Sequence, residues 1–302
     1  MTAGTMYNRL PWLTASLTGI LFSGGFAPLA QAAEPRPADS TFEVATIADI
    51  PYYQGKDAHE VKHKLDLYLP KGQKDFPVLF FVHGGAWRMG DKNHFGVYRR
   101  FGNRLARHGI GVVVPNYRLS PKVKHPAHIQ DVARAFAWTS KNIKKYGGRP
   151  DALFVSGHSA GGHLAALLAT DESYLQAEGL SLKAIKGVVA ISGIYCLPQT
   201  PLLASVFGND KSVLTQASPI THARTNAPPF LLLCAETDWP SCGKRCALAF
   251  CKALQEKKCP VEFHEIKDRS HVSILLYAYS DHDPTGRAIL AFVHKLTAAG
   301  KR

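Results

Sequence analysis

The most informative segment of the sequence is Gly157-His158-Ser159-Ala160-Gly161-Gly162. The apolar residues 152–155 come shortly before it and the small-residue run 163–169 follows it, which predicts a strand that turns into a helix within a few residues. Such a turn strains the backbone of its central residue and admits only very small neighbours. The same pattern also occurs by chance in ordinary Gly-rich turns. The flanking strand and helix favour a nucleophile elbow, with Ser159 exposed at a helix start.

A second segment predicts a site for negative charge beside that serine. The unbroken apolar run 78–82 is typical of a strand covered on both faces, and the loop His83-Gly84-Gly85-Ala86-Trp87 follows it. Because the middle of this loop has almost no side-chain bulk, the backbone N–H groups of Gly85 and Ala86 can approach a substrate oxygen. The N–H of Ala160 is expected to point to the same place, where the helix dipole also favours negative charge.

With these motifs the chain resembles an α/β-hydrolase of the carboxylesterase branch, which includes hormone-sensitive-lipase-like enzymes, kynurenine formamidases and feruloyl and acetyl-xylan esterases. The resemblance extends from about Thr41 to the C-terminus and rests on segments that follow the family's order, namely His83–Trp87, Asn116–Pro121 with His125–Ala127 and Asp131, and Gly157–His163. It implies a doubly wound, mostly parallel eight-stranded sheet with a small cap. Ala86 and His158 depart from the lipase-like pattern and are closer to the formamidases and feruloyl esterases.

The family's triad runs in the order serine, acid, histidine, so the acid is expected at the end of a later strand. Asp238 closely follows the apolar run 229–235 and is the predicted acid, with Glu236 as its local rival. His271 follows the alternating strand 261–266 in a loop, and it is the predicted base.

Other histidines are expected elsewhere. His264 lies inside the last strand and His282 lies near the closing helix, so both are expected at the surface. The triad order excludes His83 and His158 as the base. Together with Gly84 and Trp87, these two are expected to support the loops of the site.

These roles imply a definite chemistry. His271 takes the proton of Ser159 as the hydroxyl attacks a carbonyl carbon, and Asp238 orients the imidazole and stabilises its charged form. The N–H groups of Gly85, Ala86 and Ala160 form the oxyanion hole, and water then hydrolyses the acyl-enzyme. No metal and no organic cofactor is expected.

The rest of the chain fits one domain of this kind, expected over residues 33–302. Tyr195 to Pro228 contain several prolines and no long regular period, which predicts the cap. The remaining expected elements are strands over 44–53, 64–69, 110–114 and 184–192, and helices over 96–108 and 126–146.

The first 32 residues predict a secretory signal peptide. Arg9 is their only charged residue, a largely apolar run extends from Leu10 to Ala30, and Ala30-Gln31-Ala32 is a cleavage signal. Cleavage after Ala32 implies a secreted or periplasmic protein with no stable membrane insertion, and a membrane anchor is the rival interpretation.

The cysteines and the charge are less specific. Cys242, Cys246, Cys251 and Cys259 lie within 18 residues at spacings that do not match zinc knuckles. A local disulfide, Cys242 with Cys246 or Cys251 with Cys259, is one expectation and free thiols are the other, whereas Cys196 and Cys234 are expected to be buried and reduced. The net charge of +13 comes without a nucleic-acid-binding motif, so we expect a solvated basic surface and no nucleic-acid partner.

The sequence thus predicts a serine carboxylic-ester hydrolase that acts on small to medium acyl esters. Two alternatives stay open. One is an amide hydrolase similar to kynurenine formamidase, and the other is a non-catalytic binding module on a hydrolase scaffold. The oligomeric state cannot be predicted.

Overall fold

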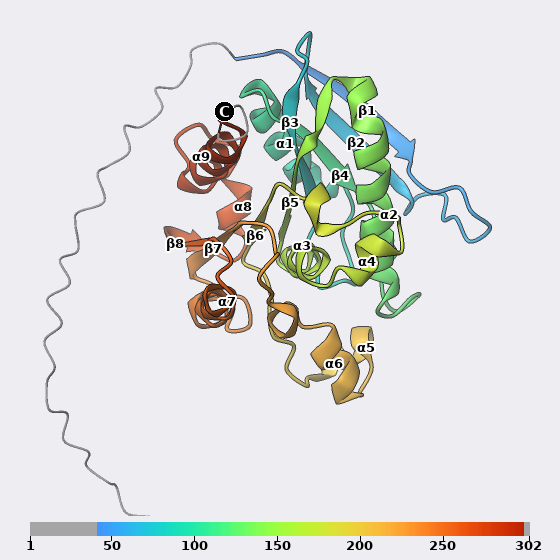
Figure 1. Ribbon diagram of the computed structural model, residues 1–302, viewed down its shortest axis with the longest axis vertical. Helices are drawn as coiled ribbons and strands as arrows, with labels where there is room; N and C mark the ends of the chain where they lie inside the picture. Colours follow the sequence, from blue (N-terminus) through green and yellow to red (C-terminus); the bar gives the residue numbers. More distant parts are fainter. Residues whose placement is uncertain (1–40, 299–302) are drawn as a thin grey trace, which may run out of the picture. The chain divides into compact units, whose positions relative to one another are not determined.

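The computed structural model describes residues 41–298, so the predicted signal peptide and its cleavage site lie outside the described residues. One mixed sheet contains eight strands in the order β1-β2-β4-β3-β5-β6-β7-β8 (Figure 1). The strands are β1 (Val44–Pro51), β2 (Lys64–Pro70), β3 (Phe76–Val82), β4 (Gly111–Pro115), β5 (Gly148–His158), β6 (Gly187–Ile191), β7 (Phe230–Thr237) and β8 (Val261–Ser270). β1 and β2 pair antiparallel, as do β2 and β4, and all later neighbours pair parallel. This confirms the predicted fold class.

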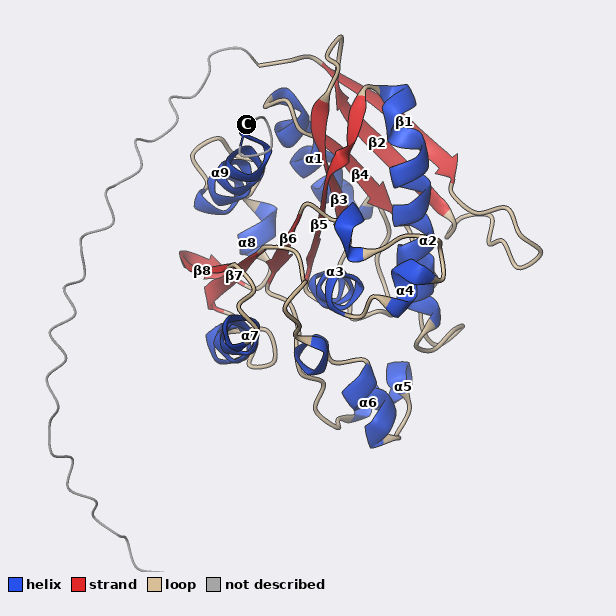
Figure 2. Cartoon of the chain, in the orientation of Figure 1, coloured by secondary structure: helices blue, strands red, loops and turns tan. Residues whose placement is uncertain are grey.

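Helices cover both faces of the sheet, as Figure 2 shows. One core contains residues of α1 (Val97–Arg107), α8 (Ser273–Leu276) and α9 (Pro284–Ala298), and the other contains residues of α2 (Ala127–Asn142), α3 (Ala160–Thr170) and α7 (Lys244–Glu256). The central strands β4 and β6 are buried along their whole length. Their continuous apolar sequences suit strands that are covered on both sides.

The region predicted as a cap contains α5 (Pro201–Phe207), α6 (Lys211–Gln216) and the 3₁₀ turn Pro219–His222. Side-chain contacts join it to the rest of the fold. The ring of Phe207 packs 5.1 Å from that of Trp87, and Nε2 of His163 donates to the carbonyl oxygen of Ala217 at 2.7 Å. The cap therefore packs on the loop after β3 and on helix α3. A further short helix, α4 (Ser173–Gln176), follows α3.

Several boundaries differ from the predicted ones. β8 continues through residues 267–270, which were expected to form a loop, because Glu236 of β7 accepts hydrogen bonds from Nζ of Lys267 and the backbone N of Asp268. The strand expected to start at residue 184 starts at Gly187 instead. A 3₁₀ turn over Leu182–Ala184 precedes it.

The cysteine predictions also need correction. All six thiols are free, so neither expected disulfide forms. The thiol of Cys259 instead donates to the carbonyl oxygen of Pro228 at 3.3 Å. Cys196 is exposed, contrary to expectation, because it lies in the loop that leaves β6 for the cap, whereas Cys234 is buried within β7. Within residues 41–298, none of the helices has the length and apolarity needed to cross a membrane.

Candidate active site

The turn between β5 and α3 has the geometry expected of a nucleophile elbow. Ser159 has φ 57° and ψ −121°, and its backbone N donates to the carbonyl oxygen of Ile191 in β6 at 2.9 Å. A Cβ on Gly157 would lie 2.3 Å from the oxygen of Gly161, and a Cβ on Gly161 would lie 2.1 Å from that of Val82. No side chain fits at either position, which explains the small residues on both sides of the serine.

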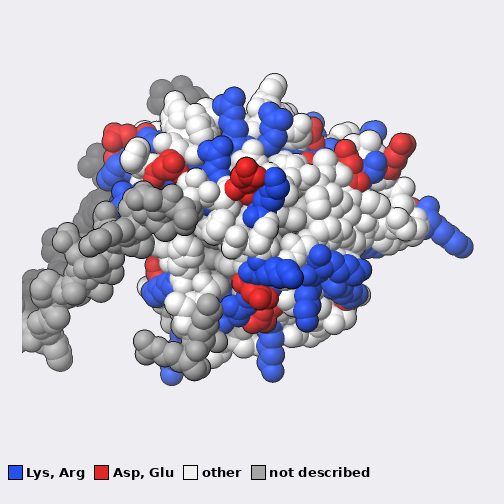
Figure 3. Space-filling model, turned by 90° about the horizontal axis from the view of Figure 1, so that it is seen from above, with Lys and Arg blue, Asp and Glu red and all other residues white. Residues whose placement is uncertain are grey.

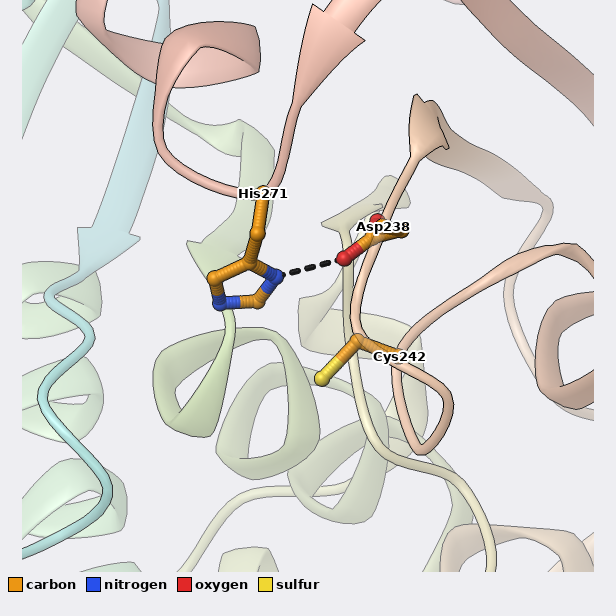
Figure 4. Close-up of side chains that lie close together, drawn as sticks. All are labelled: Asp238, Cys242 and His271. Carbon is orange, nitrogen blue, oxygen red and sulfur yellow. Dashed lines mark hydrogen bonds and ion pairs between the residues drawn. The ribbon is translucent and has the colours of Figure 1, made fainter.

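The structure brings the three predicted catalytic side chains together from the carboxyl ends of β5, β7 and β8. Nε2 of His271 lies 2.9 Å from Oγ of Ser159, and Nδ1 of His271 lies 2.6 Å from Oδ1 of Asp238. Figure 4 shows the imidazole of His271 directed at the Asp238 carboxylate. Ser159 and His271 are only 6% and 3% exposed. Both distances are within hydrogen-bonding range, so a proton can pass from the serine to the imidazole.

Asp238 is held as an anion by its surroundings. Its Oδ2 accepts hydrogen bonds from Oγ of Ser192 at 2.6 Å and from the backbone N of Ala235 at 3.1 Å. Burial raises the pKa of Asp238, but the hydrogen bonds from His271 and Ser192 outweigh it and the pKa lies below its ordinary value. The rival acid Glu236 pairs with Lys267 at 2.8 Å instead.

The loop after β3 is strained where the oxyanion donors are predicted. Gly85 has φ 118° and Ala86 has φ 51°. A Cβ on Gly85 would lie 2.1 Å from the carbonyl oxygen of Met89. The N–H of Gly84 already donates to the hydroxyl oxygen of Tyr98 at 3.1 Å. Across the site, Ala160 begins α3, where the first N–H groups have no partner within a helix.

His83 supports this loop as a buried neutral group. Its Nδ1 donates to the carbonyl oxygen of Gly84 at 2.8 Å, and its ring stacks on Tyr117 with centroids 4.3 Å apart. Burial lowers the pKa of His83 to about 4. Trp87 is buried at the end of the same loop, where it packs edge-on against His163.

His158 supports the segment that carries His271. Its Nε2 donates to the backbone carbonyl oxygen of His271 at 2.7 Å. Burial is the main cause that lowers the pKa of His158 to about 4, and nearby His271 adds to it. A neutral His158 therefore ties the elbow directly to the His271 backbone.

Two further residues touch the predicted triad and were not predicted themselves. Ser192, which follows β6 with φ 47°, donates to Asp238. The indole of Trp239 stacks on the imidazole of His271 with ring centroids 3.8 Å apart and planes at 16°. Both are next in the chain to a feature that the sequence predicts: Ser192 lies at the end of a buried strand, and Trp239 follows the predicted acid. The contacts themselves depend on the fold.

One group of side chains in the described part of the chain has the spacing of metal ligands. Atoms of Asp238, Cys242 and His271 all lie within 4.8 Å of one another (Figure 4). Two of the three already share a hydrogen bond, and burial raises the pKa of Cys242 to about 12. A protonated thiol is a poor metal ligand, so the arrangement fits a proton relay better than a metal centre.

Comparison with known sequences shows several relatives of this chain. Probable carboxylic ester hydrolase LipM of Mycobacterium tuberculosis is 35% identical over 66% of this chain, and esterase LipQ of the same organism is 33% identical over 75%. Kynurenine formamidase of Danio rerio is 29% identical over 76% of each chain. The chain spans 50% and 57% of the lengths of LipM and LipQ.

Solved structures share the fold. A truncated carbohydrate esterase from gut microbiota superimposes with a TM-score of 0.72 at 20% identity, over 87% of this chain and 99% of that one. Inhibited esterase B of Lactobacillus rhamnosis gives 0.73 at 22% identity, over 87% and 91%. Sheet, elbow and relatives together define an α/β-hydrolase of the carboxylesterase branch. Within it, the chain belongs to the BD-FAE family, whose model matches residues 65–241.

Proposed function

We propose that this protein is a serine carboxylic-ester hydrolase that forms an acyl-enzyme on Ser159. The observation that carries the proposal is the unbroken hydrogen-bond chain from Oγ of Ser159 through His271 to Asp238. The esterase names of LipM and LipQ support the same reaction class.

In the proposed reaction, Oγ of Ser159 attacks the ester carbonyl carbon while Nε2 of His271 takes the hydroxyl proton. The developing oxyanion is bound by the N–H groups of Gly85, Ala86 and Ala160, and each such donor is worth about 3 kcal/mol in the transition state. His271 then gives its proton to the departing alcohol. Water, deprotonated by His271, attacks the acyl-enzyme, and His271 returns the proton to Oγ of Ser159 as the acid is released.

We infer a preference for small to medium acyl groups, and a graded series of p-nitrophenyl esters tests it. Acetate and butyrate esters are expected to be hydrolysed faster than laurate or palmitate esters. Ser159→Ala should abolish turnover of every ester, and a chelator should leave turnover unchanged because no metal takes part. Turnover that survives Ser159→Ala would contradict the proposed nucleophile.

A formamidase-like activity is the second candidate, because kynurenine formamidase of Danio rerio aligns over 76% of both chains. The same triad can cleave a formamide bond. Comparing kcat/KM for N-formylkynurenine with kcat/KM for p-nitrophenyl acetate separates the two, and we expect the ester to be preferred. A folded sample without either activity, and without reaction with a fluorophosphonate, would instead favour a binding module.

We also propose that the protein is exported through residues 1–32. The predicted leader motivates this, and N-terminal sequencing of protein from the periplasm or the medium should begin at Ala33. Recovery of the uncut chain in the cytosol alone would contradict export.

A further inference from the structure

We propose that Trp239 is a positioning residue for the base: its indole covers the His271 imidazole and stabilises the protonated form that arises during turnover. This inference rests on the proposed function, in which His271 carries the proton of Ser159.

Trp239 contacts the proposed base and the proposed acid at once. Its indole lies nearly parallel to the imidazole of His271, with ring centroids 3.8 Å apart and planes at 16°. Its backbone N donates at 2.8 Å to Oδ1 of Asp238, the same oxygen that accepts the hydrogen bond from Nδ1 of His271 at 2.6 Å. The residue next to the acid therefore fixes the carboxylate through its backbone and the imidazole through its side chain.

Burial of Trp239 does not explain this placement. The side chain is 55% exposed although it is a large hydrophobic group, whereas the imidazole beneath it is 3% exposed. Trp239 thus lies at the surface, and packing in the core contributes little to holding its side chain in place. One face of the indole lies against His271, so the indole excludes water from the imidazole.

The face of an indole ring carries negative electrostatic potential, and it attracts a cation placed over it. The imidazole of His271 is neutral before attack and positively charged in the transition state, so this attraction grows as the reaction proceeds. This attraction therefore lowers the activation barrier, because it stabilises the transition state more than the ground state.

Few other charges face the imidazole. The titratable groups around it are Asp238, Ser159, His158 and Cys242. Burial lowers the pKa of His158 to about 4 and raises that of Cys242 to about 12, so both are neutral at pH 7. Asp238 is the only anion in this group, and it bonds the edge of the ring at Nδ1, whereas the indole adds a second source of negative potential against a face of the imidazole.

The test uses three comparison variants of the full protein and a fourth for signal assignment. Trp239→Leu keeps an apolar cover and removes the aromatic face, Trp239→Phe keeps a smaller aromatic face, and Trp138→Leu is the matched control in α2. The pKa of His271 is measured by NMR of histidine-labelled protein, with His271→Gln to assign the signal. This titration does not depend on turnover. The acid limb of the kcat/KM profile is measured in parallel on p-nitrophenyl acetate.

A cation that loses its aromatic partner is easier to deprotonate. We therefore expect the pKa of His271 to fall by roughly half a unit to one unit in Trp239→Leu, by less in Trp239→Phe, and not in Trp138→Leu. The acid limb should move to lower pH by the same amount, and plateau kcat should fall about three- to tenfold.

An unchanged or raised pKa of His271 in folded Trp239→Leu would overturn the inference. If the indole acted only by excluding water, its loss would leave the pKa of His271 unchanged or raise it. Absence of esterase activity in all proteins, with the NMR shift present, would contradict the proposed function and leave the stacking interaction established.

Discussion

Asp238 is the residue on which the local interactions of the site converge. Hydrogen bonds reach its two oxygens from Nδ1 of His271, Oγ of Ser192 and the backbone N of Ala235 and Trp239. Four donors leave the carboxylate little freedom to rotate. The imidazole of His271 is therefore held in the tautomer that presents Nε2 to the serine.

Replacing Ser192 by alanine removes one of these donors from a buried carboxylate. A hydrogen bond to a charged group contributes about 1.5–3 kcal/mol, so we expect kcat/KM to fall about tenfold or more and the pKa of Asp238 to rise. The pH profile of ester hydrolysis measures both effects. Ser156→Ala is the matched control, because the buried hydroxyl of Ser156 has no hydrogen-bond partner in the described structure. Equal losses in the two variants would contradict the role of Ser192.

Asp238→Asn tests the charge itself at nearly constant shape. An amide can hold His271 in the wrong tautomer and cannot stabilise an imidazolium, and in serine proteases such a change lowers kcat about 10⁴-fold. We expect a loss of similar size for ester turnover. Glu236→Gln, at the rival acid, should leave kcat within about twofold, and a large loss there would contradict the assignment of Asp238.

Residue-scale prediction from the sequence has a clear limit. Ser159 could be recognised because a local motif surrounds it, and Asp238 and His271 because they follow strands in the family's order. Ser192 and Trp239 could not, because their roles depend on contacts with side chains 46 and 32 positions away in the chain. Such contacts form only when parallel strands bring distant segments to one edge of the sheet.

At the scale of elements, the β5-α3 turn is the part whose geometry tolerates least change. A methyl group at position 161 would lie 2.1 Å from the oxygen of Val82 and 2.6 Å from that of His83. Both obstacles are backbone atoms and cannot move aside without shifting β3. The turn therefore couples the elbow to the loop that carries the proposed oxyanion donors.

Gly161→Ala should lower both stability and activity. The forced displacement of backbone is expected to cost roughly 1–3 kcal/mol of unfolding free energy and to reduce kcat by at least tenfold through misplaced donors. Urea denaturation and ester hydrolysis measure the two losses. Gly179→Ala is the control, because a Cβ there meets nothing within 4 Å and only its φ of +74° is unfavourable. Its kcat should stay unchanged.

Most strands and helices were predictable from the pattern of apolar residues. β3, β4 and β6 are covered on both sides, and their sequences are continuous apolar runs. The end of β8 was not predictable. Residues 267–270 are charged or polar, which is typical of a loop. They are strand because Glu236 in β7 binds Lys267 and Asp268 across the sheet edge.

At the scale of the whole molecule, charge is concentrated at the surface and neutral histidines are concentrated inside. Figure 3 shows Lys and Arg side chains spread over the face in view, with Asp and Glu among them. Inside, burial lowers the pKa of His83, His125, His128 and His158 to about 4 and that of His163 to about 3. Folding therefore keeps several imidazoles uncharged that would bind protons in the unfolded chain.

This difference predicts a loss of stability on mild acidification. Between pH 6.5 and about 4, the unfolded chain takes up protons at these histidines and the folded chain does not, so unfolding becomes more favourable as the pH falls. Each such histidine contributes up to ~1.4 kcal/mol per pH unit in this window. The free energy of unfolding, measured by urea denaturation at pH 7.5, 6.5 and 5.5, should decline steeply as the pH falls. His163→Asn should reduce the slope, and the exposed His264→Asn should not. A flat profile would contradict buried neutral histidines.

In the proposed reaction His271 makes Ser159 nucleophilic, and the site and rate of labelling by a fluorophosphonate test this directly. Peptide mapping by mass spectrometry should find one adduct, on the peptide that contains Ser159. The labelling rate should fall by at least a thousandfold in His271→Gln, which removes the base and leaves the hydroxyl in place. An adduct on another residue would contradict Ser159 as the nucleophile, and labelling of Ser159 at an unchanged rate in His271→Gln would contradict His271 as its base.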